Sequence, residues 1–86
     1  MKNITFSPNA FDQFNFWSSH DKKTHRKVVR LTNDVLRQPF EGLGKPEPLK
    51  HELKGCWSRR ITGEHRLVYK VTESSILILS CRFHYE

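Results

Sequence analysis

The chain has 86 residues, and a chain of that length builds a single modest core, because it buries only about 60–65% of its unfolded surface. It carries 15 Lys and Arg against nine Asp and Glu, a net charge of +6, which favours a polyanionic partner such as nucleic acid or an acidic protein. No apolar run reaches the roughly 20 residues of a membrane span, and the polar N-terminus lacks the apolar core of a signal peptide. These features predict a cytoplasmic protein without a membrane partner.

The beginning of the chain is predicted to form a short strand and a first helix. Residues 2–6 are the expected strand. Ser7 followed by Pro8 is a helix start, because the hydroxyl can cap free N–H groups and proline needs no N–H at that position. Apolar side chains then recur at helical spacing, at Ala10, Phe11, Phe14 and Trp17.

A second helix is predicted from the capping residue Asp21 to about Arg37, where Gln38 and Pro39 end it. Its buried face is expected to hold Thr24, Val28, Leu31 and Val35. Its polar side carries five cations in a basic stripe: Lys22, Lys23, Arg26, Lys27 and Arg30. A solvated helix face explains this stripe, and so does a phosphate-binding face, so both interpretations stay open.

The second half of the chain is predicted to form a loop and then a meander of strands. Residues 40–48 contain two Gly and two Pro, which is typical of a loop. Period-two patterns predict strands at 49–53, 56–62, 65–72 and 76–85. The expected fold is α+β, with two N-terminal helices packed on an antiparallel sheet in a single domain of residues 1–86. Strict alternation would place Ile76, Ile78, Ser80, Arg82 and His84 on one side of the last strand.

The two cysteines, Cys56 and Cys81, are isolated in the sequence. They form no CxxC pair and have no His at zinc-ligand spacing, so neither a metal site nor another cofactor is predicted. In a reducing compartment they are expected to be thiols packed in strands. The sequence also allows a cross-strand disulfide between them.

Three side chains supply the roles that RNA cleavage without a metal requires: a base, a cation and an acid. Glu47 is flanked by Pro46 and Pro48, which would hold its carboxylate stiffly in a loop. Arg66 can donate two parallel hydrogen bonds to phosphate oxygens, and His84 can act as the acid, because an unperturbed histidine changes its charge near neutral pH. A Glu, an Arg and a His occur in many small basic proteins, so composition alone is a weak argument for an active site.

The segment PFEGLGKPEPLKHELKGCWSRRITGEHRLVYKV, with the closing CRFHY, resembles the YoeB/Txe family of toxins within the RelE-like superfamily. The resemblance implies a RelE-like fold and a ribosome-dependent mRNA endonuclease of a bacterial type II toxin–antitoxin system, which cleaves mRNA in the A site and stops translation. It also implies a YefM-like antitoxin, a tendency to form homodimers, and binding to operator DNA through the antitoxin complex.

The resemblance assigns roles to residues within these motifs. Glu47 matches the general base, Arg66 the residue that stabilises the transition state, and His84 the general acid. Lys50 and Tyr85 match positions that contact phosphate or substrate. The basic stripe is expected to contact ribosomal RNA.

Other matched positions leave alternatives open. His51, Arg59 and Arg60 fall on motif positions, where they would be substrate contacts, rRNA contacts or scaffold. The chain departs from the family pattern at Cys56 and at Glu86, which follows the His-Tyr pair. A non-enzymatic toxin of the same fold or a nucleic-acid-binding module would also explain the charge, but the Glu, Arg and His combination favours the endonuclease.

Overall fold

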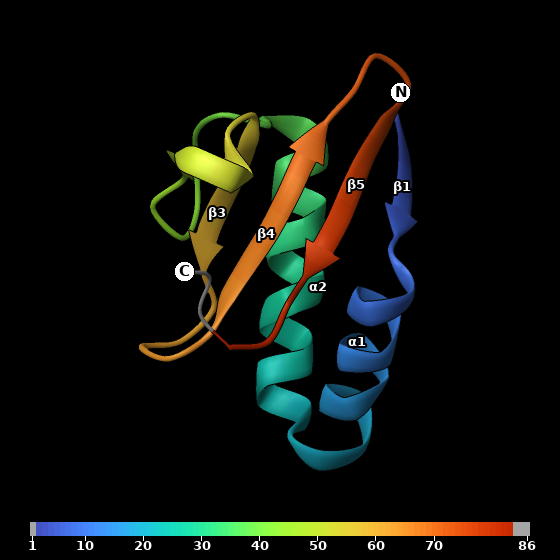
Figure 1. Cartoon of the computed structure of the whole chain (residues 1–86). Helices are drawn as coiled ribbons and strands as arrows, with labels where there is room; N and C mark the ends of the chain where they lie inside the picture. The colour runs from blue at the N-terminus through green and yellow to red at the C-terminus, as the bar shows by residue number, and fades with distance from the viewer. Residues whose placement is uncertain (1, 84–86) are drawn as a thin grey trace.

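Two helices cover one face of a five-stranded sheet in the computed structural model, which describes residues 2–83 (Figure 1). The elements in chain order are β1 (Asn3–Phe6), α1 (Pro8–His20), α2 (Lys22–Arg37), β2 (Glu47–Pro48), the 3-10 helix η1 (His51–Leu53), β3 (Cys56–Arg60), β4 (Arg66–Val71) and β5 (Ser75–Ser80). The sheet order is β1-β5-β4-β3-β2. The predicted α+β fold with two N-terminal helices is therefore confirmed.

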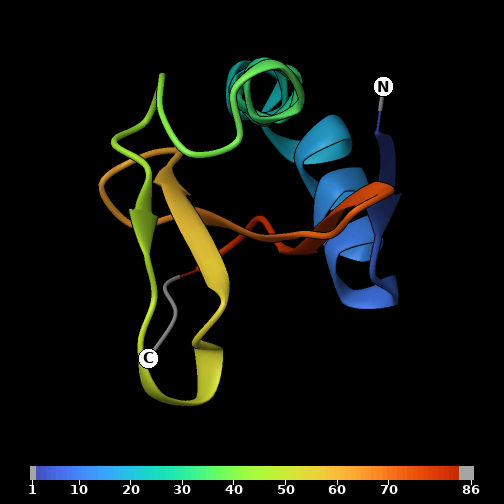
Figure 2. The same ribbon diagram turned by 90° about the horizontal axis from the view of Figure 1, so that it is seen from above.

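The sheet is mixed, whereas the strand pattern of the sequence predicts an antiparallel one. β1 pairs with β5 in parallel, and the other neighbours are antiparallel. Parallel neighbours need a long crossover connection, and here the two helices and three strands between β1 and β5 provide it. Figure 2, seen from above, shows α2 on one side of the sheet, and residues of both helices pack with Ile76 and Ile78 in one core.

Both helices begin at the predicted capping residues. The Ser7 hydroxyl accepts a hydrogen bond from the Ala10 N–H at 3.1 Å, and Pro8 is the first helical residue. The Asp21 carboxylate accepts bonds from the hydroxyl of Thr24 at 2.8 Å and from its N–H at 3.1 Å, and these bonds lower the pKa of Asp21. Such caps satisfy N–H groups that the first turn leaves free.

The core lies between the helices and the sheet. Its buried members include Ala10, Trp17, Val28, Leu31, Val35, Leu67, Tyr69, Ile76 and Ile78. The predicted face of the second helix is confirmed, since Thr24 also is buried. The apolar stripe predicted for the first helix includes Phe11, but its side chain is 54% exposed. Phe11 lies one residue beyond Ala10 along the helix, which turns it away from the buried side.

The strands are shorter than predicted. β2 has two residues and contains Glu47, for which the sequence predicts a loop, and residues 51–53 form η1 instead of the predicted strand. His51 has a φ of 58°, which breaks the extended conformation there. β3 ends at Arg60 and β5 ends at Ser80, so the prediction that the final strand continues through residues 81–83 is wrong, and its last two positions lie outside the described residues.

A β-bulge interrupts the pairing of β4 with β5. Tyr69 pairs with Ile78 but Val68 pairs with Ser80, so Leu79 is the extra residue. Ile78 faces the helices, whereas Ser80 shares the opposite face with Val68. The prediction that Ile78 and Ser80 lie on one side is therefore wrong, because the bulge shifts the alternation by one residue.

The two cysteines are free and buried in different core clusters. Cys56 packs with Leu49 and Val68 on the face away from the helices, whereas Cys81 belongs to the helix-side core. Burial raises the pKa of the Cys81 thiol to about 12. The thiol alternative is thus confirmed over the cross-strand disulfide.

Candidate functional site

Two predicted catalytic residues, Glu47 and Arg66, share the sheet face opposite the helices, here called the site face. Glu47 pairs with Ser58 and Ser58 pairs with Val68, while Arg60 pairs with Arg66. Directly paired residues point to the same side of a sheet. Strand spacings of about 4.8 Å and rises of about 3.3 Å per residue place the two backbones on the order of 12 Å apart. Their side chains and a phosphodiester can fill that gap together.

The turn between β3 and β4 holds the Arg66 guanidinium. Its Nη1 donates to the carbonyls of Thr62 at 2.8 Å, His65 at 3.1 Å and Gly63 at 3.3 Å. These bonds restrict the rotamers of a long, half-buried side chain. The cation is therefore oriented before any anion binds, which lowers the entropic cost of using it.

Backbone strain gathers around the predicted site. Three non-glycine residues within the described part of the chain have positive φ: Lys45 (52°), His51 (58°) and Phe83 (67°). Lys45 precedes Glu47 by two residues, and His51 directly follows Lys50. Strained residues of this kind cluster at functional sites. The sequence carried no signal for them, because none is a glycine or an asparagine.

The predicted acid His84, its neighbour Tyr85, and Glu86 lie outside the described residues. Phe83 is the last described residue, and its carbonyl accepts a hydrogen bond from the Arg66 N–H at 3.1 Å. The Phe83 N–H donates to Nδ1 of His65 at 2.7 Å. The described chain therefore ends beside Arg66.

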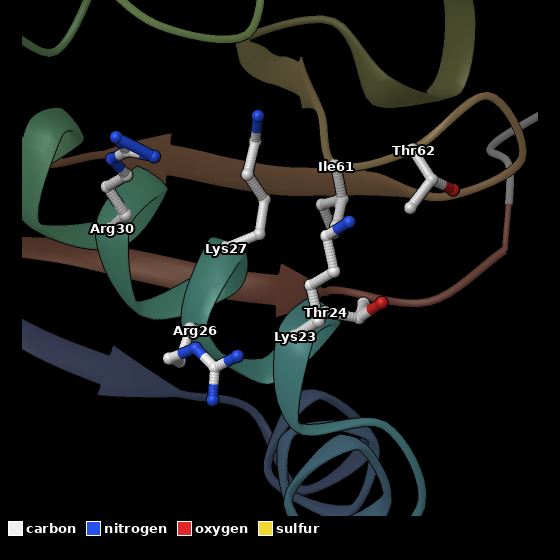
Figure 3. Close-up of a pocket in the computed structure, with 7 residues that line it drawn as sticks. All are labelled: Lys23, Thr24, Arg26, Lys27, Arg30, Ile61 and Thr62. Atoms are coloured by element: carbon white, nitrogen blue, oxygen red, sulfur yellow. The ribbon is translucent and has the colours of Figure 1, made fainter.

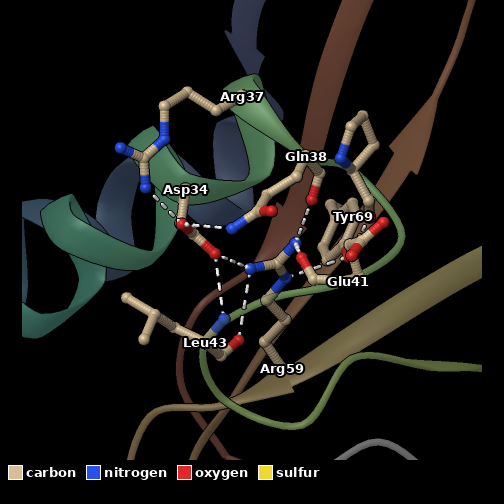
Figure 4. A network of polar contacts seen from close by, with 8 residues as sticks. Asp34, Arg37, Gln38, Glu41, Leu43, Arg59 and Tyr69 are labelled. Carbon is tan, nitrogen blue, oxygen red and sulfur yellow. Dashed lines mark hydrogen bonds and ion pairs between the residues drawn. The ribbon is translucent and has the colours of Figure 1, made fainter.

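Arg59 is fully buried and faces the helices, so the predicted phosphate contact at this residue is wrong and the scaffold alternative holds. Its guanidinium donates to the Asp34 carboxylate at 2.5 Å and to the Tyr69 hydroxyl at 3.1 Å. It also binds the carbonyls of Gln38, Glu41 and Leu43 (Figure 4). These groups are the Arg59 network. Arg59 shares its period-two face with Trp57 and Ile61, a signal of burial that the sequence did contain.

The Arg59 network fixes the loop that leads from α2 to Glu47. Asp34 accepts the Leu43 N–H at 2.9 Å, and the Tyr69 hydroxyl donates to the Pro39 carbonyl at 2.7 Å. Burial acts to raise the pKa of Asp34, but hydrogen bonds from Leu43, Arg37, Gln38 and Arg59 outweigh it and hold that pKa well below its usual range. Gly42 has a φ of 113° and lies so close to Asp34 that a Cβ would overlap the carboxylate. The loop conformation is therefore closely specified.

Most of the basic stripe lines an open groove of about 800 Å³, shown in Figure 3. Seven residues line this basic groove: Lys23, Thr24, Arg26, Lys27, Arg30, Ile61 and Thr62. Lys22 is exposed at the first position of α2. Because the Thr62 carbonyl also holds Arg66, the groove adjoins the turn that anchors the site. Four cations in one concave surface suit a phosphate backbone.

The remaining predicted contacts, Lys50, His51 and Arg60, are exposed. Arg60 lies on the site face beside Arg66. Among residues 2–83, no three His, Cys, Asp or Glu side chains gather in a way that could hold a metal ion. No helix in that range is both long and apolar enough to span a membrane.

A family model described as the YoeB-like toxin of a bacterial type II toxin–antitoxin system matches residues 6–85. The toxin YoeB of Escherichia coli K12 is 54% identical over 82 residues, which cover 95% of this chain and 98% of that one. The match thus spans both halves of the fold, including the motifs that carry Glu47 and Arg66.

Solved structures agree with the sequence match. The YoeB dimer from Staphylococcus aureus has a TM-score of 0.91 and 48% identity over 98% of each chain. The YoeB-YefM complex from the same organism has a TM-score of 0.90 and 46% identity over 99% of each. A chain of the toxin–antitoxin complex RelBE2 from Mycobacterium tuberculosis, at 24% identity and a TM-score of 0.71 over 96% of this chain and 98% of that one, shares the fold. The chain therefore belongs to the YoeB-like family of toxins of bacterial type II toxin–antitoxin systems, with a RelE-like fold.

Proposed function

We propose that this toxin is an endoribonuclease that cleaves mRNA in the ribosomal A site and so inhibits translation. The observation that carries the proposal is the shared site face of Glu47 and Arg66, which lie at a separation that a phosphodiester can bridge. A carboxylate and a guanidinium in this relation supply a proton acceptor and a cation for one phosphoryl centre.

The proposed reaction needs neither a metal nor a cofactor. Glu47 accepts the proton of a ribose 2′-hydroxyl, and the 2′-oxygen forms a bond to the adjacent phosphorus. Arg66 stabilises the negative charge of the phosphorane. The bond from phosphorus to the 5′-oxygen then breaks, and His84 donates its proton to that oxygen. The products are a 2′,3′-cyclic phosphate and a 5′-hydroxyl.

Further residues contact the substrate in this proposal. Lys50 and Arg60 are exposed cations, Arg60 lies beside Arg66, and both bind flanking phosphates in this proposal. Tyr85 stacks on a base or binds a phosphate. The basic groove, together with Lys22, binds ribosomal RNA, and its position beside the Arg66 turn directs the site face toward the A-site codon.

Reversal of one charge in the basic groove is expected to weaken ribosome binding. At about 0.1 M salt, Lys27→Glu should lower the affinity by about tenfold, because phosphate contacts dominate such interfaces. The readout is ribosome co-sedimentation over a range of salt concentrations. Any residual cleavage of free RNA should be unchanged.

The matched control is Lys2→Glu, since the Lys2 ammonium binds the Thr72 and Glu73 carbonyls, and none of these residues lines the basic groove. It should leave ribosome affinity within about twofold. Equal losses of free-RNA cleavage and of ribosome affinity in Lys27→Glu would contradict the docking role of the groove.

A cognate YefM-like antitoxin neutralises the toxin in this proposal. The YoeB-YefM complex of Staphylococcus aureus supports such a partner, and the YoeB dimer of that organism supports a homodimer. The net charge of +6 favours an acidic, partly disordered segment that folds as it binds. Operator DNA is bound only through the antitoxin complex.

The test is a purified translation system programmed with one defined mRNA. The protein is expected to cut that mRNA at the A-site codon, and the cognate antitoxin should prevent the cut. Arrest of translation with intact mRNA would contradict the proposal and would indicate a non-enzymatic toxin of the same fold.

A further inference from the structure

The segment that follows β5 is fixed by α1. The Cys81 N–H donates to Oε1 of Gln13 at 2.7 Å, and the Cys81 carbonyl accepts from Nε1 of Trp17 at 2.8 Å. Its thiol contacts the Ala10 carbonyl at 3.6 Å. Cys81 is fully buried, so the chain leaves the sheet from a well-defined point.

Phe83 is held in a strained conformation two residues later. Its φ is 67°, a left-handed value that a bulky residue adopts only when surrounding contacts impose it. The two contacts on its backbone come from the start of β4: His65 accepts its N–H at 2.7 Å, and the Arg66 N–H donates to its carbonyl at 3.1 Å. The His65 partner is a side chain, so a substitution at residue 65 can remove this contact without changing the backbone partner at Arg66.

The His65 ring is itself wedged between aromatic residues. It packs edge-on against Trp17, with centroids 4.9 Å apart, and lies 5.8 Å from the Phe83 ring. The Arg82 guanidinium lies 4.5 Å from the Phe83 ring centre and 3.6 Å from that of Phe16. Helix α1 therefore orients His65, and His65 orients Phe83.

The direction of the hydrogen bond between Phe83 and His65 identifies Nδ1 of the His65 ring as an acceptor. A backbone N–H can only donate, so Nδ1 must accept with its lone pair. The ring is therefore a specific acceptor as well as a packing element. An apolar ring of similar shape would keep the packing and lose the bond.

We propose that His65 is a positioning residue for the catalytic acid. It accepts the Phe83 N–H at Nδ1 and so fixes the strained residue that directly precedes His84. The inference rests on the proposed function, because it assigns His65 a role in the reaction through His84. Small displacements of a catalytic group have large effects on rate, of the order of 100-fold for about 1 Å.

The test compares two substitutions that separate the acceptor from the ring. His65→Asn places Oδ1 near the position of Nδ1 and keeps an acceptor, whereas His65→Phe keeps the aromatic contacts with Trp17 and Phe83 and removes it. Cleavage of ribosome-bound mRNA is measured under single-turnover conditions with saturating toxin, together with the toxin concentration at half-maximal rate and the thermal midpoint.

His65→Phe is expected to lower the maximal cleavage rate by about tenfold or more, with the half-saturating concentration within about twofold of wild type. His65→Asn should stay within about threefold of the wild-type rate. Full activity of His65→Phe, or equal losses in the two variants, would overturn the proposal.

Two further measurements keep the result decisive. In the unmodified protein, the Phe83 amide should exchange with solvent at least 100-fold more slowly than in an unstructured peptide, and an unprotected amide would overturn the inference even if both variants fail to fold. A His84→Ala chain serves as the control. If it cleaves like wild type, the proposed role of His84 fails; if it is inactive while His65→Phe is fully active, only the role of His65 fails.

Discussion

Replacement of Asp34 by alanine is expected to lower the free energy of unfolding by about 3–5 kcal/mol, because it leaves the fully buried Arg59 guanidinium without its counter-charge. The Leu43 N–H loses its acceptor in the same variant. This loss is a large share of the about 5–15 kcal/mol that stabilises a small domain. Urea unfolding, followed by the fluorescence of Trp17 and Trp57, measures it.

Arg37→Met is the matched control, because Arg37 binds the same carboxylate from the surface. Its Nη2 lies 2.6 Å from Asp34, but its side chain is 73% exposed. Exposed pairs contribute about 0–1 kcal/mol, so this variant should stay within about 1 kcal/mol of wild type. Equal losses for Asp34→Ala and Arg37→Met would mean that the buried half of the network adds little stability.

The lowered pKa of Asp34 gives the same prediction a pH dependence. Since its folded pKa lies below the ordinary value of 3.8, the carboxylate stabilises the fold fully above about pH 4 and loses that contribution as the pH falls toward the folded pKa. The unfolding free energy of Asp34→Asn should therefore depend less steeply on pH than that of wild type between about pH 4 and pH 2. Identical slopes would contradict the lowered pKa.

Substitution of Glu47 by glutamine is expected to lower the cleavage rate by about 10²–10⁴-fold, because the amide has nearly the same shape and cannot accept the proton of the 2′-hydroxyl. Glu47 is exposed at the sheet edge, so the fold should be unaffected. Single-turnover cleavage of ribosome-bound mRNA measures the effect, and ribosome co-sedimentation shows whether binding persists.

Glu52→Gln is the control for this prediction. Glu52 is another exposed carboxylate close in sequence, in η1, and the proposed reaction gives it no role. It should keep a rate within about twofold of wild type. A wild-type rate in Glu47→Gln, or equal losses in both variants, would show that Glu47 is not the base.

The sequence predicted the helices well because their signals are local. Ser7, Pro8 and Asp21 act within one turn of the residues that they cap, and the buried face of α2 repeats at helical spacing. The strands were predicted less well, since β2 has only two residues and its pairing with β3 depends on the conformation of the preceding loop.

The sequence predicted which residue types form the candidate site, but not the long-range contacts that hold them in place. The motif resemblance predicts Glu47 and Arg66 as catalytic residues, and the sheet register places them on one face. The bulge at Leu79 and the contacts of His65 with Phe83 join residues far apart in the chain, and no periodicity reports such pairs. The motif left Arg59 open as a substrate contact, an rRNA contact or scaffold, and its alternation with Trp57 and Ile61 already favoured the buried scaffold position that the structure shows.

The most direct test of the central claim is the chemistry of the cut ends produced on ribosomes with bound mRNA, after EDTA treatment that leaves the ribosomes assembled. Attack by the 2′-oxygen leaves a 2′,3′-cyclic phosphate and a 5′-hydroxyl. The proposed roles of Glu47, Arg66 and His84 predict these ends, and they predict the same cleavage rate with and without EDTA. A 5′-phosphate end, or cleavage that EDTA abolishes, would indicate attack by a metal-activated water and contradict the account.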